Sequence, residues 1–85
     1  MKATVVGMKK VDFMSDNELV KMKKYFLTVD TGEIDEGLEV EVLTFRELNE
    51  KGEYEPAPIF NLGQEIEIAY NKRGRARYVE PRKSA

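Results

Sequence analysis

Five segments of this chain have the residue pattern of β-strands, and short runs of turn-forming residues separate most of them. Some segments are rich in β-branched and aromatic residues, and others alternate apolar with polar residues, which indicates a strand with one buried face. The sequence therefore predicts an all-β fold. The predicted strands are 3–14, 19–31, 38–45, 64–71 and 75–80.

The first predicted strand is long and does not keep its apolar residues on one face. Val5 and Val11 have odd numbers. Val6 and Met8 have even numbers, and Gly7 lies between them. A glycine inside a strand often marks a bulge or a sharp bend, which lets residues of both parities reach a core. We therefore expect this strand to bend at Gly7 and to curl between two sheets.

The segment 16–24 fits two interpretations. Asp16 and Leu19 have the spacing of one helical face, which favours a helix. A turn signal at 15–18, followed by the strand-like run 25–29, favours a β-hairpin instead. We prefer the hairpin.

The third predicted strand has the most regular alternation in the chain. Its pattern predicts that Leu38, Val40 and Val42 face a core. The same pattern directs Glu39 and Glu41 towards solvent.

The rest of the chain completes the expected topology. A polar connection at 46–58, with a helical turn at 46–49, leads to a final hairpin whose turn is 71–74. A bent first strand, a three-strand meander, a long connection and a final hairpin describe the five-stranded OB barrel. An SH3-like barrel has a similar strand content and is the alternative. We expect one OB-like domain at 1–81 and a flexible tail at 82–85.

The chain contains no cysteine and no histidine. It therefore has no disulfide and no thiolate metal site, and it lacks the commonest general base and metal ligand. The acidic residues between 30 and 36 do not have the spacing of an EF-hand loop. We expect a binding protein rather than an enzyme, with no metal site and no cofactor.

The N-terminal residues 1–7 have no apolar signal-peptide core and enter a strand-like pattern directly. No apolar run in the chain is long enough to span a membrane. We expect a cytoplasmic protein without a membrane partner.

Basic and aromatic residues interleave in two places, although the net charge of the chain is −2. Cations meet phosphates and flat rings stack on bases, so this combination suits a site for single-stranded nucleic acid. The candidate contacts are Lys9, Lys10, Lys21, Lys23, Lys24, Tyr25 and Phe26 in the first half of the chain, and Lys72, Arg73, Arg75 and Arg77 around the final hairpin.

Several of these residues have an alternative structural role. Tyr25 shares its parity with apolar neighbours, so burial in the core is an alternative for its ring. Lys72 and Arg73 have the alternative of being solvated residues of a hairpin turn. Arg75 and Arg77 lie on one face of a short strand, where a polyanion would relieve their repulsion.

Four acidic residues bear on the same hypothesis. Glu65 and Glu67 are alternative salt-bridge partners for the arginines of the final hairpin. Glu39 and Glu41 oppose a nucleic-acid-binding face on the third strand, because they would repel phosphate.

The stretches 5–12, 23–26, 62–66 and 70–74 carry a resemblance to a known family. With them the chain resembles the small single-stranded DNA-binding proteins of filamentous phages, the gene V type. It is more similar to their OB-fold relatives from Gram-positive phages and conjugative elements. The resemblance implies binding without sequence specificity, with Tyr25 in the position of a stacking tyrosine and nearby lysines on phosphates. The phage proteins dimerise through a long final hairpin, which is short here.

We therefore expect a protein of a phage or mobile element that binds single-stranded nucleic acid, DNA in preference to RNA. A homodimer is possible. The alternative function is a protein-interaction module that docks on a larger DNA-transfer or replication complex, which the acidic net charge favours.

Overall fold

The computed structural model describes residues 1–47 and 56–80, and within these ranges the chain is all-β. The strands are β1 (Lys2–Ser15), β2 (Glu18–Val29), β3 (Glu39–Arg46), β4 (Glu65–Tyr70) and β5 (Ala76–Tyr78). Each corresponds to one predicted strand, so the all-β prediction is confirmed. The predicted tail at 82–85 lies outside the described residues.

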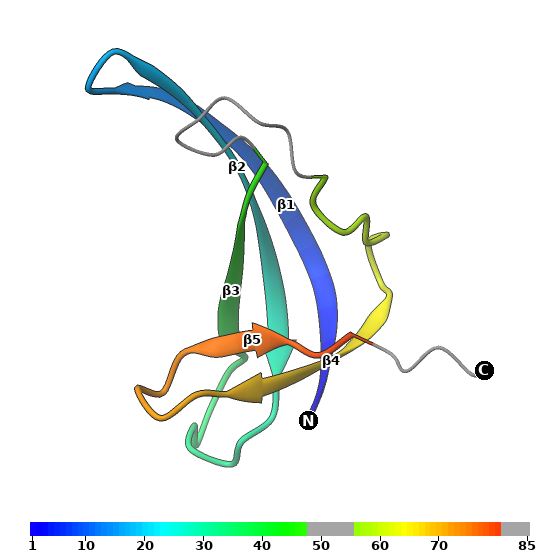
Figure 1. Cartoon of the computed structure of the whole chain (residues 1–85). Helices are drawn as coiled ribbons and strands as arrows, with labels where there is room; N and C mark the ends of the chain where they lie inside the picture. The colour runs from blue at the N-terminus through cyan, green and yellow to red at the C-terminus, as the bar shows by residue number, and fades with distance from the viewer. Residues whose placement is uncertain (48–55, 81–85) are drawn as a thin grey trace, which may run out of the picture.

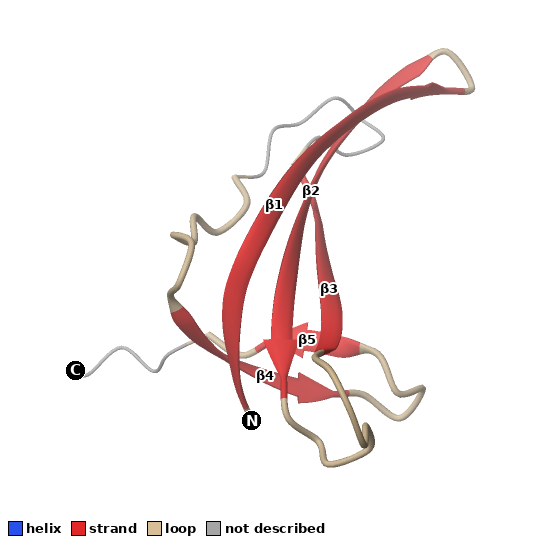
Figure 2. Cartoon of the chain, turned by 180° about the vertical axis from the view of Figure 1, so that it is seen from behind, coloured by secondary structure: helices blue, strands red, loops and turns tan. Residues whose placement is uncertain are grey.

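The strands form one antiparallel sheet in the order β3-β2-β1-β4-β5. Figures 1 and 2 show β1, β2 and β3 running along the molecule, while the β4–β5 hairpin crosses them at one end. The rings of Phe45 on β3 and Tyr78 on β5 meet with their centroids 6.5 Å apart, but no ladder joins these two strands. The sheet is therefore not closed, and neither an OB barrel nor an SH3-like barrel is confirmed.

β1 contains the predicted irregularity at Gly7. Val5 faces Leu27 of β2, whereas Gly7 faces Phe26, so Val6 is an extra residue that forms a bulge. A bulge bends its strand and shifts the alternation of the side chains by one residue. Beyond the bulge, β1 and β2 continue as a long two-stranded hairpin that extends from the rest of the molecule (Figure 1).

The long hairpin closes through a two-residue turn at Asp16 and Asn17. Their φ angles are 50° and 65°, as a type I′ turn requires, and Asx residues tolerate this left-handed region. Ser15 faces Glu18 across the turn. The hairpin prediction is confirmed, and the helical alternative for 16–24 is wrong.

The core lies between one face of β1, β2 and β3 and the β4–β5 hairpin. We call this face the inner face and the opposite one the outer face. The core residues are Ala3, Val5, Tyr25, Leu27, Leu43, Phe60, Ile66 and Ile68.

Tyr25 anchors the connection before β4 to the sheet. Its hydroxyl donates a hydrogen bond to the carbonyl oxygen of Pro58 at 2.8 Å and accepts one from the backbone N–H of Phe60 at 3.3 Å. Its ring also packs against Phe60, with centroids 4.7 Å apart. The phenol therefore satisfies backbone groups that lie within an aromatic core.

β3 is turned the opposite way from the sequence prediction. Leu38, Val40 and Val42 are 76%, 54% and 41% exposed, whereas Leu43 is 4% exposed. The pairing with β2 decides this orientation, because it places Leu43 opposite the buried Tyr25. The expectation that the three alternating apolar residues face the core is therefore wrong.

Glu39 and Glu41 lie on the inner face and find polar partners at its rim. Glu39 accepts a hydrogen bond from the hydroxyl of Thr31 at 2.7 Å. Glu41 accepts one from the hydroxyl of Tyr70 at 3.1 Å. These bonds offset the desolvation of the two half-buried carboxylates.

The described residues contain no helix, so none of them belongs to a helix that could cross a membrane. Arg46 ends β3 and Glu47 forms a bend, which excludes a helical turn at the start of the predicted 46–49 segment. The end of that segment lies outside the described residues.

The orientation of β3 predicts different costs for two neighbouring substitutions. Leu43→Ala should lower the free energy of unfolding by about 2–5 kcal/mol, because it leaves a cavity in the core. Val42→Ala should cost less than about 1 kcal/mol, the span of strand propensity at an exposed site. Urea unfolding of both variants measures the difference. A larger cost for Val42→Ala would contradict the observed register.

Candidate nucleic-acid interface

Three cross-strand rows occupy the middle of the outer face, and we call them together the outer patch. Residues directly opposite each other in an antiparallel pair share a face and have Cβ atoms about 4.5–5.5 Å apart. The rows, from β1 to β3, are Gly7, Phe26 and Val42, then Lys9, Lys24 and Thr44, then Val11, Met22 and Arg46.

Phe26 is the aromatic ring of the outer patch. The ring carbon Cδ2 lies 3.5 Å from the point where a Cβ atom of residue 7 would be, so the ring lies against Gly7. Because glycine has no side chain, β1 supports this ring without covering it, and Phe26 is only half-buried. A planar apolar surface is therefore open on the outer face.

Lys9 and Lys24 lie directly opposite each other, one row from Phe26. Neither makes an ion pair within the ranges 1–47 and 56–80. Like charges opposite each other in a sheet are unfavourable, and a bound anion would relieve the repulsion. Arg46 adds a third cation in the next row.

The outer patch contains no acidic residue. Glu39 and Glu41 belong to the inner face, so the phosphate repulsion expected from them does not arise on the outer one. Glu18 occupies the outer face only at the far end of the long hairpin, opposite Ser15. No acidic cluster within the described part of the chain is placed to hold a metal ion.

Tyr25 does not belong to this patch. Its side chain is 2% exposed and points into the core from the other side of β2. A base cannot stack on a ring that the protein covers on both sides. The stacking role that the resemblance implies for Tyr25 therefore does not fit this structure, and the ring available on the same strand is Phe26.

The other candidate lysines of the first half lie on the inner face. Lys10 is opposite Lys23, and Lys21 is opposite Asp12. The amino group of Lys23 lies 3.3 Å from a carboxylate oxygen of Glu47, and only 13% of the side chain is exposed. Lys23 is therefore neutralised within the chain, and its assignment as a phosphate contact is not supported by this geometry.

The final hairpin places its basic residues elsewhere. The side chain of Asn71 accepts hydrogen bonds from the backbone N–H groups of Arg73 at 2.9 Å and Arg75 at 3.0 Å, and thereby organises the turn that contains Lys72. Gly74 of this turn borders a hollow that Glu33, Glu39 and Glu41 also line. The structure thus places this turn beside an acidic hollow and not in the outer patch.

Arg77 lies opposite Ala69 on β4, and it has no ion pair with Glu65 or Glu67. Glu67 binds the N-terminal amino group instead, at 2.6 Å. The salt bridges considered as an alternative for the final hairpin are therefore not formed.

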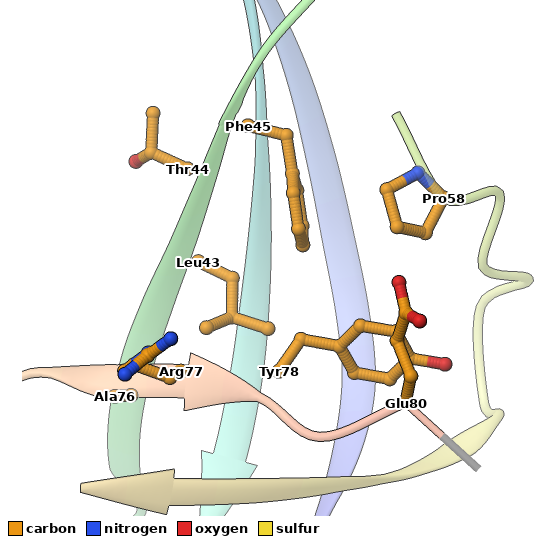
Figure 3. Close-up of a pocket in the computed structure, with 8 residues that line it drawn as sticks. All are labelled: Leu43, Thr44, Phe45, Pro58, Ala76, Arg77, Tyr78 and Glu80. Atoms are coloured by element: carbon orange, nitrogen blue, oxygen red, sulfur yellow. The ribbon is translucent and has the colours of Figure 1, made fainter. Parts of the chain in front are cut away.

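Arg77 instead borders a cleft between the unpaired edges of β3 and β5, shown in Figure 3. Phe45 and Tyr78 form its apolar wall, and Pro58 and Glu80 lie at its margin. The cleft marks the place where the sheet remains open.

Six residues of the outer patch are not among the site residues that the sequence predicts, namely Gly7, Val11, Met22, Val42, Thr44 and Arg46. The sequence pattern predicts Arg46 in a connection and Val42 in the core. The missing signal is the strand register, because only the pairing of β2 with β1 and β3 shows that these residues lie beside Phe26 and Lys24.

Comparison with known proteins finds no protein-family model, no curated protein and no solved structure that matches the chain.

Two titratable groups, Lys23 on the inner face and Tyr70 on β4, predict a loss of stability at alkaline pH. Burial, the hydrogen bond to Glu41 and nearby carboxylates raise the pKa of Tyr70 above 10.0. Burial works to lower the pKa of Lys23, but the bond to Glu47 and the neighbouring charges outweigh it, so this pKa is raised above 10.5. Both groups titrate at lower pH in the unfolded chain. Their stabilising contribution is therefore complete below about pH 10 and is lost as the pH rises through the folded values.

Urea unfolding between pH 8 and 11.5 measures this decline. Tyr70→Phe should make it shallower, because the variant has no phenol at this position to ionise. An equally steep decline in Tyr70→Phe would contradict the role of Tyr70.

Proposed function

We propose that this protein binds single-stranded nucleic acid through the outer patch, without sequence specificity and without catalysis. DNA is the proposed ligand in preference to RNA, on the basis of the sequence resemblance. The same resemblance leads us to propose that the protein belongs to a phage or mobile element. We also propose that it acts in the cytoplasm, since no apolar run in the sequence is long enough to span a membrane. The observation that carries the proposal is a half-exposed aromatic ring one row from Lys9 and Lys24, in a patch without acidic residues.

The electrostatic part of the proposal rests on the separation of charge between the two faces. The inner face holds Glu39, Glu41 and Glu47, each with a partner in the chain. The outer patch holds Lys9 and Lys24, which have no ion-pair partner among the described residues. A protein with a net charge of −2 can therefore attract phosphates locally, because salt screens charges more than about 8–10 Å away.

The stacking part rests on Phe26. A base that stacks on an aromatic side chain contributes about 1–3 kcal/mol, and it does so for every base because each has a π-face. Thr44, on the neighbouring strand and one row from Phe26, offers a hydroxyl as a hydrogen-bond donor, and Arg46 lies one row further. This arrangement suits contacts with a flexible backbone rather than with the edges of particular bases.

We also propose that the open sheet is an OB-type barrel, in preference to an SH3-like one. The support is a β1 bent by a bulge, a long connection between β3 and β4, and a β5 that meets β3 through side chains. OB folds are partly open five-stranded barrels that bind oligonucleotides on β2 and β3, the strands that supply most of the outer patch.

A protein-interaction module docking on a larger DNA-transfer or replication complex is the second candidate. Val40, Val42 and Phe13 favour it, because they are 54%, 41% and 43% exposed on the same outer face. Exposed apolar side chains that gather on one face often mark a protein contact. If no nucleic acid binds at low salt, the protein-interaction module is the candidate that remains.

The first test measures how binding depends on salt. A labelled single-stranded oligonucleotide should bind the wild-type chain more tightly than its duplex does, and affinity should fall as salt rises because phosphate counterions are released. Lys9→Gln with Lys24→Gln should flatten the plot of log K against log salt by about 1.4, since each phosphate contact on a single strand contributes about 0.7.

The matched control is Lys72→Gln with Arg73→Gln, which makes the same change of charge in the β4–β5 turn. It should leave the slope unchanged. Equal flattening by both double variants would show a general charge effect and contradict the outer patch. An RNA oligonucleotide of the same sequence tests the preference for DNA.

The second test uses the absence of tryptophan from the chain. Phe26→Trp creates a single fluorophore at the proposed stacking position, and oligonucleotide binding should quench its emission. Phe26→Leu keeps an apolar side chain but no ring, and it should weaken binding by about 5- to 150-fold without changing the salt slope, as expected for one lost stack. Unquenched emission on saturation, or full affinity in Phe26→Leu, would exclude this ring as the platform.

A further inference from the structure

Among the residues that the structure describes, the edge of β1 away from β2 is unpaired over most of its length. This edge pairs with β4 only at Lys2, Ala3 and Thr4. Val5 then exchanges hydrogen bonds with the segment before β4, at 2.9 Å and 2.7 Å. Beyond Val5, no other described strand lies along this edge (Figure 1). An unpaired edge of this length is a template for another strand.

The direction of the backbone groups along the open edge follows from the turn of the long hairpin. Ser15 and Glu18 flank a type I′ turn, so their backbone groups point at each other. In an antiparallel ladder this direction alternates along the strand. Every second residue back from the turn therefore presents its N–H and C=O to the open edge. These residues are Met8, Lys10, Asp12 and Met14.

The side chains of these four residues share the inner face. Their order is apolar, basic, acidic, apolar, so the reversed order places a basic residue opposite an acidic one. Met8 and Met14 are 46% and 64% exposed. Lys10 and Asp12 are also exposed, and neither makes an ion pair within the described residues. The segment therefore complements itself when it is paired with an antiparallel copy.

We propose that two copies of this chain pair through the open edges of β1, antiparallel and about a two-fold axis at Val11. In this register, Lys10 of each copy lies opposite Asp12 of the other. Met8 lies opposite Met14 of the second copy. On the outer face, Lys9 lies opposite Phe13 of the second copy, where a cation can rest on an aromatic ring.

Charge complementarity selects this register. An axis at Lys9, Lys10 or Asp12 would place that charged residue opposite its own copy, which is unfavourable. An axis at Phe13 would place Asp12 opposite Met14 and leave the charge without a partner. Of the centres between Lys9 and Phe13, Val11 alone pairs unlike charges.

The length of the open edge also matches the length of the segment that would pair in this register. About an axis at Val11, Ser15 of the second copy lies opposite Gly7. The turn of the second copy therefore lies beside Val6. Val5 is the residue at which the segment before β4 stops bonding to β1. The paired segment 7–15 thus fills the edge that the fold leaves open. The contact is isologous and closes at two copies.

The pairing also balances the charges of the inner face. Lys10 lies opposite Lys23 in its own chain, and Asp12 lies opposite Lys21. In the dimer, Asp12 of the second copy would lie on the other side of Lys10. Each Asp12 would then lie between two lysines, and each Lys10 would gain a carboxylate neighbour. Because the axis is perpendicular to the sheet, the two outer patches face the same side.

Sedimentation equilibrium of the full chain without nucleic acid tests this inference independently of the proposed function. The monomer has a mass of 9.8 kDa, and the mass should rise with concentration to twice that value and no further. Lys10→Glu and Asp12→Lys should each weaken the dimer by about tenfold or more, since each places like charges opposite one another. The two changes combined should restore it, because Glu at 10 would then face Lys at 12 of the second copy.

Lys72→Glu makes the same change of charge as Lys10→Glu outside the proposed contact, and it should leave dimerisation unchanged. Far-UV circular dichroism checks the fold of each variant, and rescue by the double exchange separates lost pairing from misfolding. A chain that stays at 9.8 kDa at every concentration would overturn the inference. A dimer indifferent to both single exchanges, an assembly larger than two, or a double exchange without rescue would overturn it as well.

Discussion

The bulge in β1 is the constraint on which the rest of this structure depends. Because Val6 is inserted between two paired residues, Gly7 and not Val6 meets Phe26, and Lys9 and not Lys10 comes to share a face with Lys24. An unbroken ladder would place Gly7 opposite Tyr25. It would also place Val6 opposite Phe26, where the valine side chain would lie against the ring. The exposed ring, the pair of lysines beside it and the composition of the open edge all follow from one additional residue.

The second organising feature is the phenol of Tyr25. It holds the connection before β4 against the sheet by two hydrogen bonds and joins Phe45, Phe60 and Tyr78 in one aromatic core. With the aromatic core on the inner face of β2, the outer face of the same strand is free to carry polar and basic residues. Adjacent residues of β2, Tyr25 and Phe26, thus have opposite roles, one in stability and one in the proposed contact.

Charge is distributed by the same alternation. The acidic residues of β3 lie on the inner face, where hydroxyl groups at the rim satisfy them, and the cations of the outer patch have no acidic neighbour in their rows. Although the net charge of the chain is only −2, acidic residues of β3 lie on the inner face and basic residues lie in the outer patch. If the open edges of β1 pair as proposed, two such outer patches form one continuous surface, and the proposed binding and pairing use different groups of the same strand.

Local sequence patterns were enough to predict the all-β class, the approximate position of every strand, the irregularity at Gly7 and the turn of the long hairpin. These features depend on local backbone preference and on the period of the pattern, which neighbouring residues carry. The sequence could not decide which face of each strand is buried, so it placed Val42 inside and joined Lys23 with Lys24 in one site. The pairing of the strands sets which face is buried, because a one-residue change of register exchanges the two faces of a strand. That register depends on residues distant in the chain, which local patterns do not report.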